Sequence, residues 1–440
     1  MSETFDRVLH SIANASPHRP EGVVVDVVGL VIEVQGLRGG VGDLLEVDRT
    51  RGMPLLLEIV GFRGGRLVTT PLGPVDGVKA GDKVRLSARG SRVFVGDVLL
   101  GRILDAFGDP MDGGPPLVTS ESYPMRQAPP SAVERKSIRE SFSTGVRAID
   151  SLLTLGRGQR VGIFAGPGVG KTTLLGMLCR TSEADVNVVA LVGERGRELN
   201  DFIRDSLGPE GLARSVLVTA TSDMPPLVRA RAAETATSIA EYYRDRGKNV
   251  LLVMDSVTRY AMAMREAALA SGEPPATKGY PPSVFAALPR LLERAGTCGG
   301  TGVITAIYTV LVDGDDLQDP VSDTVRGILD GHIVLSRSLA ERNHYPAVDV
   351  LASVSRLAPI VMAKEQTRAA GAVRDLMATY REAQDLIQVG AYVQGSDPKV
   401  DASVRAQPLI DMFLRQGVTE PTPFDQTMGA MMQLASMNAR

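Results

Sequence analysis

The stretch Arg160–Leu175, RVGIFAGPGVGKTTLL, decides the fold. An apolar run leads into a glycine-rich turn, which is followed by Gly170-Lys171-Thr172 and a helical continuation. Glycines let backbone N–H groups approach phosphate oxygens, and the N-terminus of the following helix adds a positive dipole end. Ala165 stands where the strict motif has glycine, and we expect this small residue to keep the turn. The order strand, loop, helix therefore predicts a phosphate-binding P-loop.

Each member of this loop has an expected contact. Lys171 is expected to reach the β- and γ-phosphates of ATP, and the Thr172 hydroxyl is expected to ligate Mg²⁺. The remaining nucleotide-binding positions of the loop are Gly166, Pro167, Gly168, Val169, Gly170 and Thr173.

Two further strand-like runs end in a carboxylate. The run VLLVMDS, Val250–Ser256, places Asp255 at the exit of a buried strand, on the ligand side of a parallel sheet. Asp255 is therefore expected to hold Mg²⁺ through water. In VALVGERGREL, Glu194 lies at a second strand exit and can orient and polarise the attacking water. A structural ion pair between Glu194 and Arg195 is the alternative.

The region around these motifs alternates apolar runs with helical patterns, which predicts a mostly parallel sheet with helices on both faces. We assign residues 91–355 to this α/β nucleotide-binding domain. The segment from 225 to 247 reads as a helix that Gly247 ends. The strand candidates are residues 160–165, 186–192, 215–220, 250–254, 303–308 and 332–336.

Different patterns flank this domain. Residues 1–22 form an amphipathic segment and linker that either packs on its own protein or docks on a partner or a membrane-bound assembly. Residues 23–90 hold short β-branched runs separated by turns, which predicts a small β-barrel. Phe62 is its one aromatic ring, so a base-stacking platform is not expected there. Residues 356–440 read as amphipathic helices and a helical C-terminal domain.

Composition narrows the class of protein. The 440 residues carry a formal net charge of −3, without the basic surplus of a sequence-independent nucleic-acid binder. Cys179 and Cys298 are too few for a disulfide framework, which suits a cytoplasmic location. No secretory signal and no apolar run long enough to span a bilayer is recognised. The histidines, which lack metal-ligand spacing, are His10, His18, His332 and His344.

Together these motifs resemble the catalytic ATPases of type III protein export, the family that serves the flagellum and the injectisome. The α and β subunits of rotary ATP synthases are its cousins. The resemblance implies a RecA-like P-loop NTPase core, an N-terminal small β-barrel and a C-terminal helical domain. It runs from about residue 20 to the end and is carried by GVRAID, AGPGVGKTTLLGM, LVGERGREL, MDSVTRYAMAMREAALASGEPPATKGYPPSVFAALPRLLERAG, YTVLVDGDD, ILDGHIVLSR and HYPAVDVLASVSR.

The resemblance also implies residue roles. Glu194 matches the catalytic glutamate that non-catalytic α-type subunits lack, and Arg195 beside it helps to organise the site. Tyr345, in HYPAVD, matches the aromatic residue that packs against adenine. Arg356, in SVSR, matches an arginine finger that reaches into the adjacent subunit's site. With Lys171, these residues form the expected catalytic set, and the expected assembly is a homohexamer.

For partners, the resemblance implies stalk and regulator proteins, chaperone–substrate complexes and an export gate at the inner face of the cytoplasmic membrane. The runs GVGKTTLLGM, ATKGYPPS and GAYVQGSDP favour the flagellar branch over the injectisome branch. Two other readings stay open. A hexameric RNA translocase shares the core and the barrel. The slightly negative net charge and the scarcity of aromatic residues in the barrel argue against nucleic-acid binding. A rotary ATP synthase catalytic subunit shares the core but not the C-terminal third.

Overall fold

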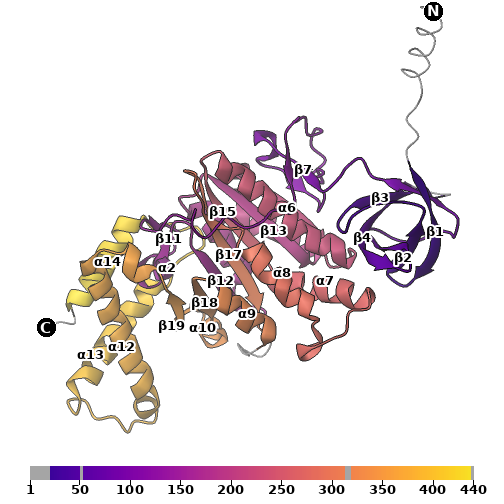
Figure 1. The fold of residues 1–440 in the computed structure, drawn as a ribbon. Coiled ribbons are helices and arrows are strands. Elements are labelled where there is room, and N and C mark those ends of the chain that lie inside the picture. The colour runs from indigo at the N-terminus through magenta and orange to yellow at the C-terminus, as the bar shows by residue number, and fades with distance from the viewer. Residues whose placement is uncertain (1–19, 50–52, 313–318, 438–440) are drawn as a thin grey trace, which may run out of the picture. The chain divides into compact units, whose positions relative to one another are not determined.

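The computed structural model describes residues 20–49, 53–312 and 319–437. These residues form two compact units, and Figure 1 shows the helices and strands of each. Of the predicted N-terminal segment and linker, residues 1–19, with His10 and His18, lie outside the described residues. The predicted linker end is wrong at Glu21 and Gly22, because both already belong to the first strand of the barrel.

The first unit is a closed antiparallel barrel with the strand order β1-β2-β5-β4-β3-β6. Its interior is filled by aliphatic side chains such as Ile32, Leu45 and Leu57, which are fully buried. The predicted barrel is confirmed, while Phe62 is 60% exposed on its surface. Its strands are β1 (Glu21–Val28), β2 (Val31–Gln35), β3 (Leu44–Val47), β4 (Leu55–Arg63), β5 (Arg66–Pro71) and β6 (Lys83–Leu86).

Within the described residues, the second unit is built on a nine-stranded sheet. Its main path runs β19-β18-β12-β17-β15-β13-β14-β8, with β16 paired to β17. Strands β18 to β8 along this path are parallel, and β19 is antiparallel to β18. The strands are β8 (Ile103–Leu104), β12 (Arg160–Ala165), β13 (Val186–Glu194), β14 (Ser215–Thr221), β15 (Asn249–Asp255), β16 (Gly296–Thr297), β17 (Val303–Leu311), β18 (Gly331–Leu335) and β19 (Val348–Ser355).

The predicted strands all occur, but β13 and β17 run further than their apolar cores suggested. Strand β13 is buried over its whole length, and its last residue, Glu194, still pairs with Thr221 of β14. Three strands of this sheet were missed. The two-residue strands β8 and β16 are too short for a pattern, and β19 mixes buried and exposed positions irregularly.

Helices cover this sheet. Helix α6 packs on β13, β14 and β15. It begins at Pro226, because proline has no backbone N–H and suits the first turn of a helix. The helices are α2 (Arg147–Leu152), α3 (Lys171–Thr181), α4 (Gly196–Asp201), η2 (Phe202–Leu207), α5 (Gly208–Ala213), α6 (Pro226–Asp245), α7 (Val257–Ala270), α8 (Pro282–Leu292), α9 (Pro320–Ile328), α10 (Arg337–Glu341) and α11 (Ala358–Val361). Small elements complete the unit: β7 (Arg92–Phe94), η1 (Asp97–Leu99), β9 (Ser122–Pro124), β10 (Ser141–Phe142), β11 (Leu155–Gly156) and η3 (Thr277–Gly279).

The chain ends in α12 (Lys364–Gln388), α13 (Pro398–Leu414) and α14 (Phe424–Met437), as the helical prediction for this region requires. Buried residues of these helices share one hydrophobic cluster with the central sheet. The predicted domain boundary at residue 356 therefore remains a prediction.

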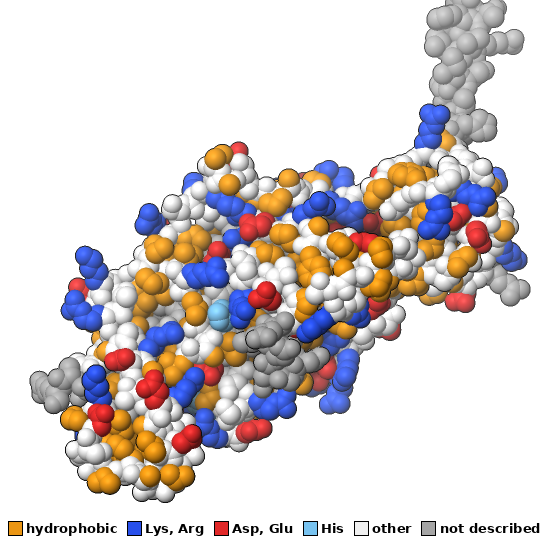
Figure 2. Space-filling model, turned by 60° about the horizontal axis from the view of Figure 1, so that its bottom comes forward, with side chains coloured by type: hydrophobic (Ala, Val, Ile, Leu, Met, Phe, Trp, Pro, Cys, Tyr) orange, Lys and Arg blue, Asp and Glu red, His pale blue; other side chains and the backbone are white. Residues whose placement is uncertain are grey.

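Hydrophobic side chains also lie on the surface of this helical end, at the lower left of Figure 2. None of the described helices combines the length and apolar character needed to cross a bilayer.

Two helical glycines allow a test of this packing. A Cβ at Gly176 in α3 would clash with the backbone oxygen of Ser206, whereas a Cβ at Gly371 in α12 would meet nothing within 4 Å. Gly176→Ala is therefore expected to destabilise the fold by about 1–3 kcal/mol. Gly371→Ala is expected to stabilise it by about 0.5–1 kcal/mol, because alanine restricts the unfolded chain. Thermal unfolding midpoints that move in the same direction for both variants would contradict this assignment.

Candidate active site

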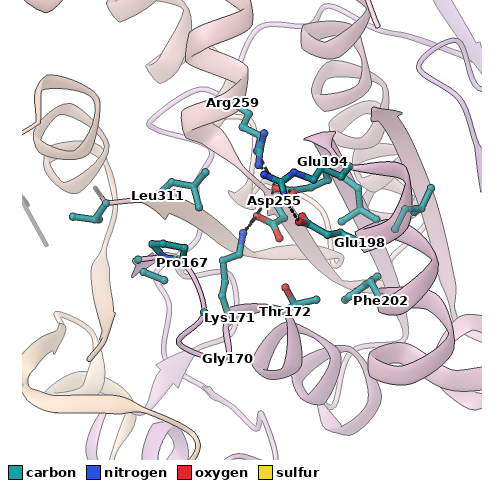
Figure 3. Close-up of a pocket in the computed structure, with 17 residues that line it drawn as sticks. Pro167, Gly170, Lys171, Thr172, Glu194, Glu198, Phe202, Asp255, Arg259 and Leu311 are labelled. Atoms are coloured by element: carbon teal, nitrogen blue, oxygen red, sulfur yellow. Dashed lines mark hydrogen bonds and ion pairs between the residues drawn. The ribbon is translucent and has the colours of Figure 1, made fainter. Parts of the chain in front are cut away.

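A cavity of about 390 Å³ opens at the carboxyl ends of the parallel strands β12, β13 and β15 (Figure 3). Its position agrees with the rule that ligands bind at this edge of an open α/β sheet. The residues that line it are Ala165, Gly166, Pro167, Gly168, Gly170, Lys171, Thr172, Leu191, Glu194, Arg195, Glu198, Leu199, Phe202, Asp255, Arg259, Leu311 and Val312.

The glycine-rich loop between β12 and α3 forms one wall. Gly168 has φ +78° and Gly170 has φ +89°, in the left-handed region that glycine adopts without strain. A Cβ at Gly168 would meet no atom within 4 Å, so this part of the backbone borders open space. Val169 is instead buried, and neither it nor Thr173 lines the cavity. The loop thus presents backbone at the N-terminus of α3, as phosphate binding needs.

Lys171 and Asp255 meet across the cavity. The Lys171 Nζ donates to Asp255 Oδ1 at 2.5 Å and lies 3.9 Å from Glu194 Oε1. Asp255 is 3% exposed, and its Oδ1 also accepts a hydrogen bond from the Thr309 hydroxyl at 2.7 Å. The ammonium group therefore lies between two buried carboxylates, and its charge balances part of theirs.

Glu194 ends β13 and points into the same space (Figure 3). Arg259 approaches both of its oxygens, at 3.1 Å from Oε1 and 3.3 Å from Oε2, but only the Oε2 contact has hydrogen-bond geometry. Burial, and next the negative charge of Asp255, raise the pKa of Glu194 to about 7. Oε1 is a buried oxygen without a hydrogen-bond donor in the part of the chain that the structure describes.

Arg195 does not pair with Glu194 among the described contacts. Its side chain is 77% exposed and lies 3.6 Å from Glu198, one turn along α4. The alternative of a Glu194–Arg195 ion pair therefore finds no contact here, and Arg259 from α7 is the cation beside Glu194.

Tyr345 precedes β19 by three residues and Arg356 follows it directly, and neither belongs to the set that lines the cavity. Tyr345 is 39% exposed, and its ring borders the P-loop, because a Cβ at Gly170 would lie 3.3 Å from Tyr345 Cε1. Arg356 is exposed, and its backbone N–H donates to the Asp330 carbonyl. Its guanidinium group has no ion pair with any described residue. The fold thus brings Lys171, Thr172 and the carboxylates together and leaves Arg356 outside.

Sequence reasoning missed three residues of this site: Glu198, Arg259 and Thr309. Arg259 follows Asp255 by one helical turn, and this spacing from a strand exit was a usable signal. Thr309 carried no signal, because its contact depends on β17 lying between β12 and β15.

The residues present fit ATP with Mg²⁺. The open backbone at Gly168 and the Lys171 ammonium suit phosphate oxygens, which are anionic acceptors. The Thr172 hydroxyl and the Asp255 carboxylate offer the oxygen donors that Mg²⁺ prefers. No described residue donates a hydrogen bond to the buried Glu194 Oε1, and a water molecule could supply this donor.

Three family models match the chain in sequence order. Residues 24–87 match the beta-barrel domain of the ATP synthase alpha/beta family, residues 145–355 match its nucleotide-binding domain, and residues 362–433 match the T3SS EscN ATPase C-terminal domain.

Individual relatives agree with these models. The chain is 49% identical to the flagellum-specific ATP synthase of Bacillus subtilis, over 97% of this chain and 98% of that protein. It is 46% identical to the type 3 secretion system ATPase of Xanthomonas euvesicatoria, over 97% of this chain and 96% of that protein. The structure of the assembled ATPase EscN in complex with its central stalk EscO, from enteropathogenic E. coli, matches with a TM-score of 0.88 at 43% identity. That match covers 94% of this chain and all of the EscN chain. The chain therefore belongs to the type III protein export ATPases, the branch of the ATP synthase alpha/beta family that includes flagellum-specific ATP synthases and type 3 secretion system ATPases.

Proposed function

We propose that this chain hydrolyses Mg-ATP in a homohexameric ring that energises flagellar type III protein export. The observation that carries the proposal is the convergence of Lys171, Asp255 and Glu194 on one cavity beside an open glycine-rich loop. These groups are the ones that phosphoryl transfer needs, because its catalysis is mainly positioning and charge stabilisation.

Each residue has a distinct task in this proposal. The loop backbone and Lys171 bind the β- and γ-phosphates, and Tyr345 packs against adenine. Thr172 and Asp255 hold Mg²⁺, which when bound neutralises charge on the phosphate oxygens. Glu194 accepts a hydrogen bond from the attacking water and polarises it, while Arg259 holds the orientation of Glu194. Arg195, exposed at the rim of the cavity, helps to organise the site.

The raised pKa of Glu194 predicts a pH dependence. Glu194 can accept a proton only as the carboxylate, and with a pKa of about 7 it is mostly protonated at pH 6 and mostly ionised at pH 8. Because kcat/KM reports groups of the free enzyme, it is expected to rise ~10-fold between these pH values. The measurement is initial-rate hydrolysis at saturating Mg²⁺. A profile that stays flat over this range would contradict the assignment of Glu194 as the base.

The position of Arg356 favours a ring of several copies of this chain. Its guanidinium lies outside the cavity of its own chain and has no ion pair with the described residues, so it is available to a neighbouring copy. The assembled state of the EscN relative supports a ring, and the stalk bound there supports a coiled-coil stalk partner for this chain.

The flagellar assignment rests on the sequence runs quoted above. Sequence identity adds little to it, because the flagellum-specific relatives are 46–50% identical to this chain and the secretion ATPases are 43–50% identical. The ring lies in the cytoplasm, peripheral to the inner face of the membrane. There it meets regulator proteins, chaperone–substrate complexes and the export gate, and it binds no nucleic acid.

Two experiments test this function. Purified protein is expected to hydrolyse ATP only with Mg²⁺, at a rate that RNA does not change; stimulation by RNA would instead favour a translocase. In the source bacterium, deletion of the gene is expected to stop secretion of flagellar filament protein, and re-expression of the intact chain is expected to restore it. Normal filaments in the deletion strain would overturn the flagellar assignment.

A further inference from the structure

Thr309 on β17 contacts the active-site carboxylate from inside the sheet. Its side chain is fully buried, and its hydroxyl lies 2.7 Å from Asp255 Oδ1 and 3.3 Å from the Met254 carbonyl oxygen. A hydroxyl has one proton to donate. The nearer and charged acceptor, Asp255 Oδ1, therefore takes the stronger bond.

The sheet order makes this contact rigid. Strand β17 lies between β12, which leads into the P-loop, and β15, which ends in Asp255. The register pairs Ile163 with Thr309 and Met254 with Tyr308, so Thr309 is level with the exit of β15. Hydrogen-bonded strands on both sides hold the Thr309 backbone in place.

Both donors to Asp255 meet the same oxygen. Lys171 Nζ and Thr309 Oγ1 bond to Oδ1, whereas no described residue donates to Oδ2. In the proposed function, Lys171 is drawn toward phosphate when ATP binds. Thr309 then remains as the fixed donor to Oδ1, and its bond keeps Oδ2 turned toward the cavity that Asp255 lines.

From this geometry we propose that Thr309 is a positioning residue that orients Asp255 for Mg²⁺. The inference rests on the proposed Mg-ATPase function and deepens it. Thr309 touches neither nucleotide nor metal; it acts through the carboxylate. Its removal should weaken the contribution of Mg²⁺ to nucleotide binding and leave the binding of metal-free nucleotide unchanged.

The test uses Thr309→Val, which replaces the hydroxyl by a methyl group of similar size. ADP affinity is measured by titration calorimetry on the full chain, once with excess Mg²⁺ and once with a chelator. Loss of a hydrogen bond to a charged group predicts that Mg-ADP binds about tenfold more weakly, while metal-free ADP binds as in the wild type. The Mg²⁺ concentration for half-maximal hydrolysis is expected to rise by a similar factor. Thr309→Ser, which keeps the hydroxyl, is expected to restore both values.

Thr237→Val is the matched control. Thr237 is also fully buried, but its hydroxyl donates at 2.8 Å to the Ala233 carbonyl within α6, away from the cavity. Equal Mg-ADP affinities for Thr309→Val and wild type would overturn the inference. An equal loss with and without Mg²⁺ would also overturn it, because the defect would then be a general distortion. If Mg²⁺ has no effect on the wild-type protein itself, the proposed function fails instead.

Discussion

Arg356→Ala is expected to bind ATP with near wild-type affinity and to hydrolyse it at least ~10³-fold more slowly. An arginine finger stabilises charge that develops only in the transition state, and in other P-loop enzymes it contributes about 10³–10⁵ in rate. Arg356 is exposed and lies outside the cavity of its own chain, so its loss leaves the binding residues untouched. Steady-state hydrolysis and nucleotide titration on the same preparation check both parts. Arg356→Lys is the charge-matched control. It is expected to recover little of the hydrolysis rate, because lysine lacks the planar guanidinium group that can donate two parallel hydrogen bonds.

Mixing two inactive variants tests whether the finger acts on a neighbouring copy. Lys171→Ala removes the ammonium group proposed to bind phosphate but keeps the proposed finger, and Arg356→Ala does the reverse. A mixed ring contains sites with an intact Lys171 from one chain and an intact Arg356 from the next. Hydrolysis is therefore expected to appear on mixing, and wild-type activity per chain is expected to rise with protein concentration. A mixture that stays inactive, with wild-type activity independent of concentration down to a verified monomer, would mean that the site is complete in one chain.

Glu194→Gln is expected to lower kcat by ~10²–10⁴ and to leave nucleotide affinity nearly unchanged. The amide is isosteric with the carboxylate but cannot accept a proton from the attacking water, and general base catalysis contributes about this factor. Glu194 is 7% exposed and bonded to Arg259, so the replacement keeps the packing.

Glu198→Gln is the matched control for this replacement. Glu198 lines the same cavity and pairs with the exposed Arg195, and its hydrogen bond to Glu194 is one cause of the raised pKa of Glu194. Its isosteric change is expected to alter kcat by less than a few-fold when the rate is measured at pH 8, where Glu194 is mostly ionised. A similar loss for both variants would show that the net negative charge of the cavity matters and not the proton acceptor at Glu194.

Most of the charged and glycine residues that line this cavity could be predicted from the sequence, because the motifs that contain them are short and continuous. The P-loop needs a strand, glycines and a helix start in succession, and all of these lie within Arg160–Leu175. Asp255 and Glu194 were found because a carboxylate after a buried strand of a parallel sheet lies at the ligand edge whatever the strand order. The β-barrel and the C-terminal helices were likewise readable from side-chain periodicity.

Contacts between distant strands were decided only by the tertiary structure. Whether Glu194 pairs with Arg195 or with Arg259 depends on where α4 and α7 lie relative to β13, and the structure gives Arg259. Thr309 reaches Asp255 because β17 lies between β12 and β15 in the sheet. This spatial order differs from the order of the strands along the chain, so local sequence patterns do not reveal it. Local pattern thus predicted residues that the structure places around one cavity, since phosphate and metal binding require particular groups at strand exits. The order of strands in the sheet decided which neighbours hold those groups, since hydrogen bonds between side chains depend on spatial adjacency.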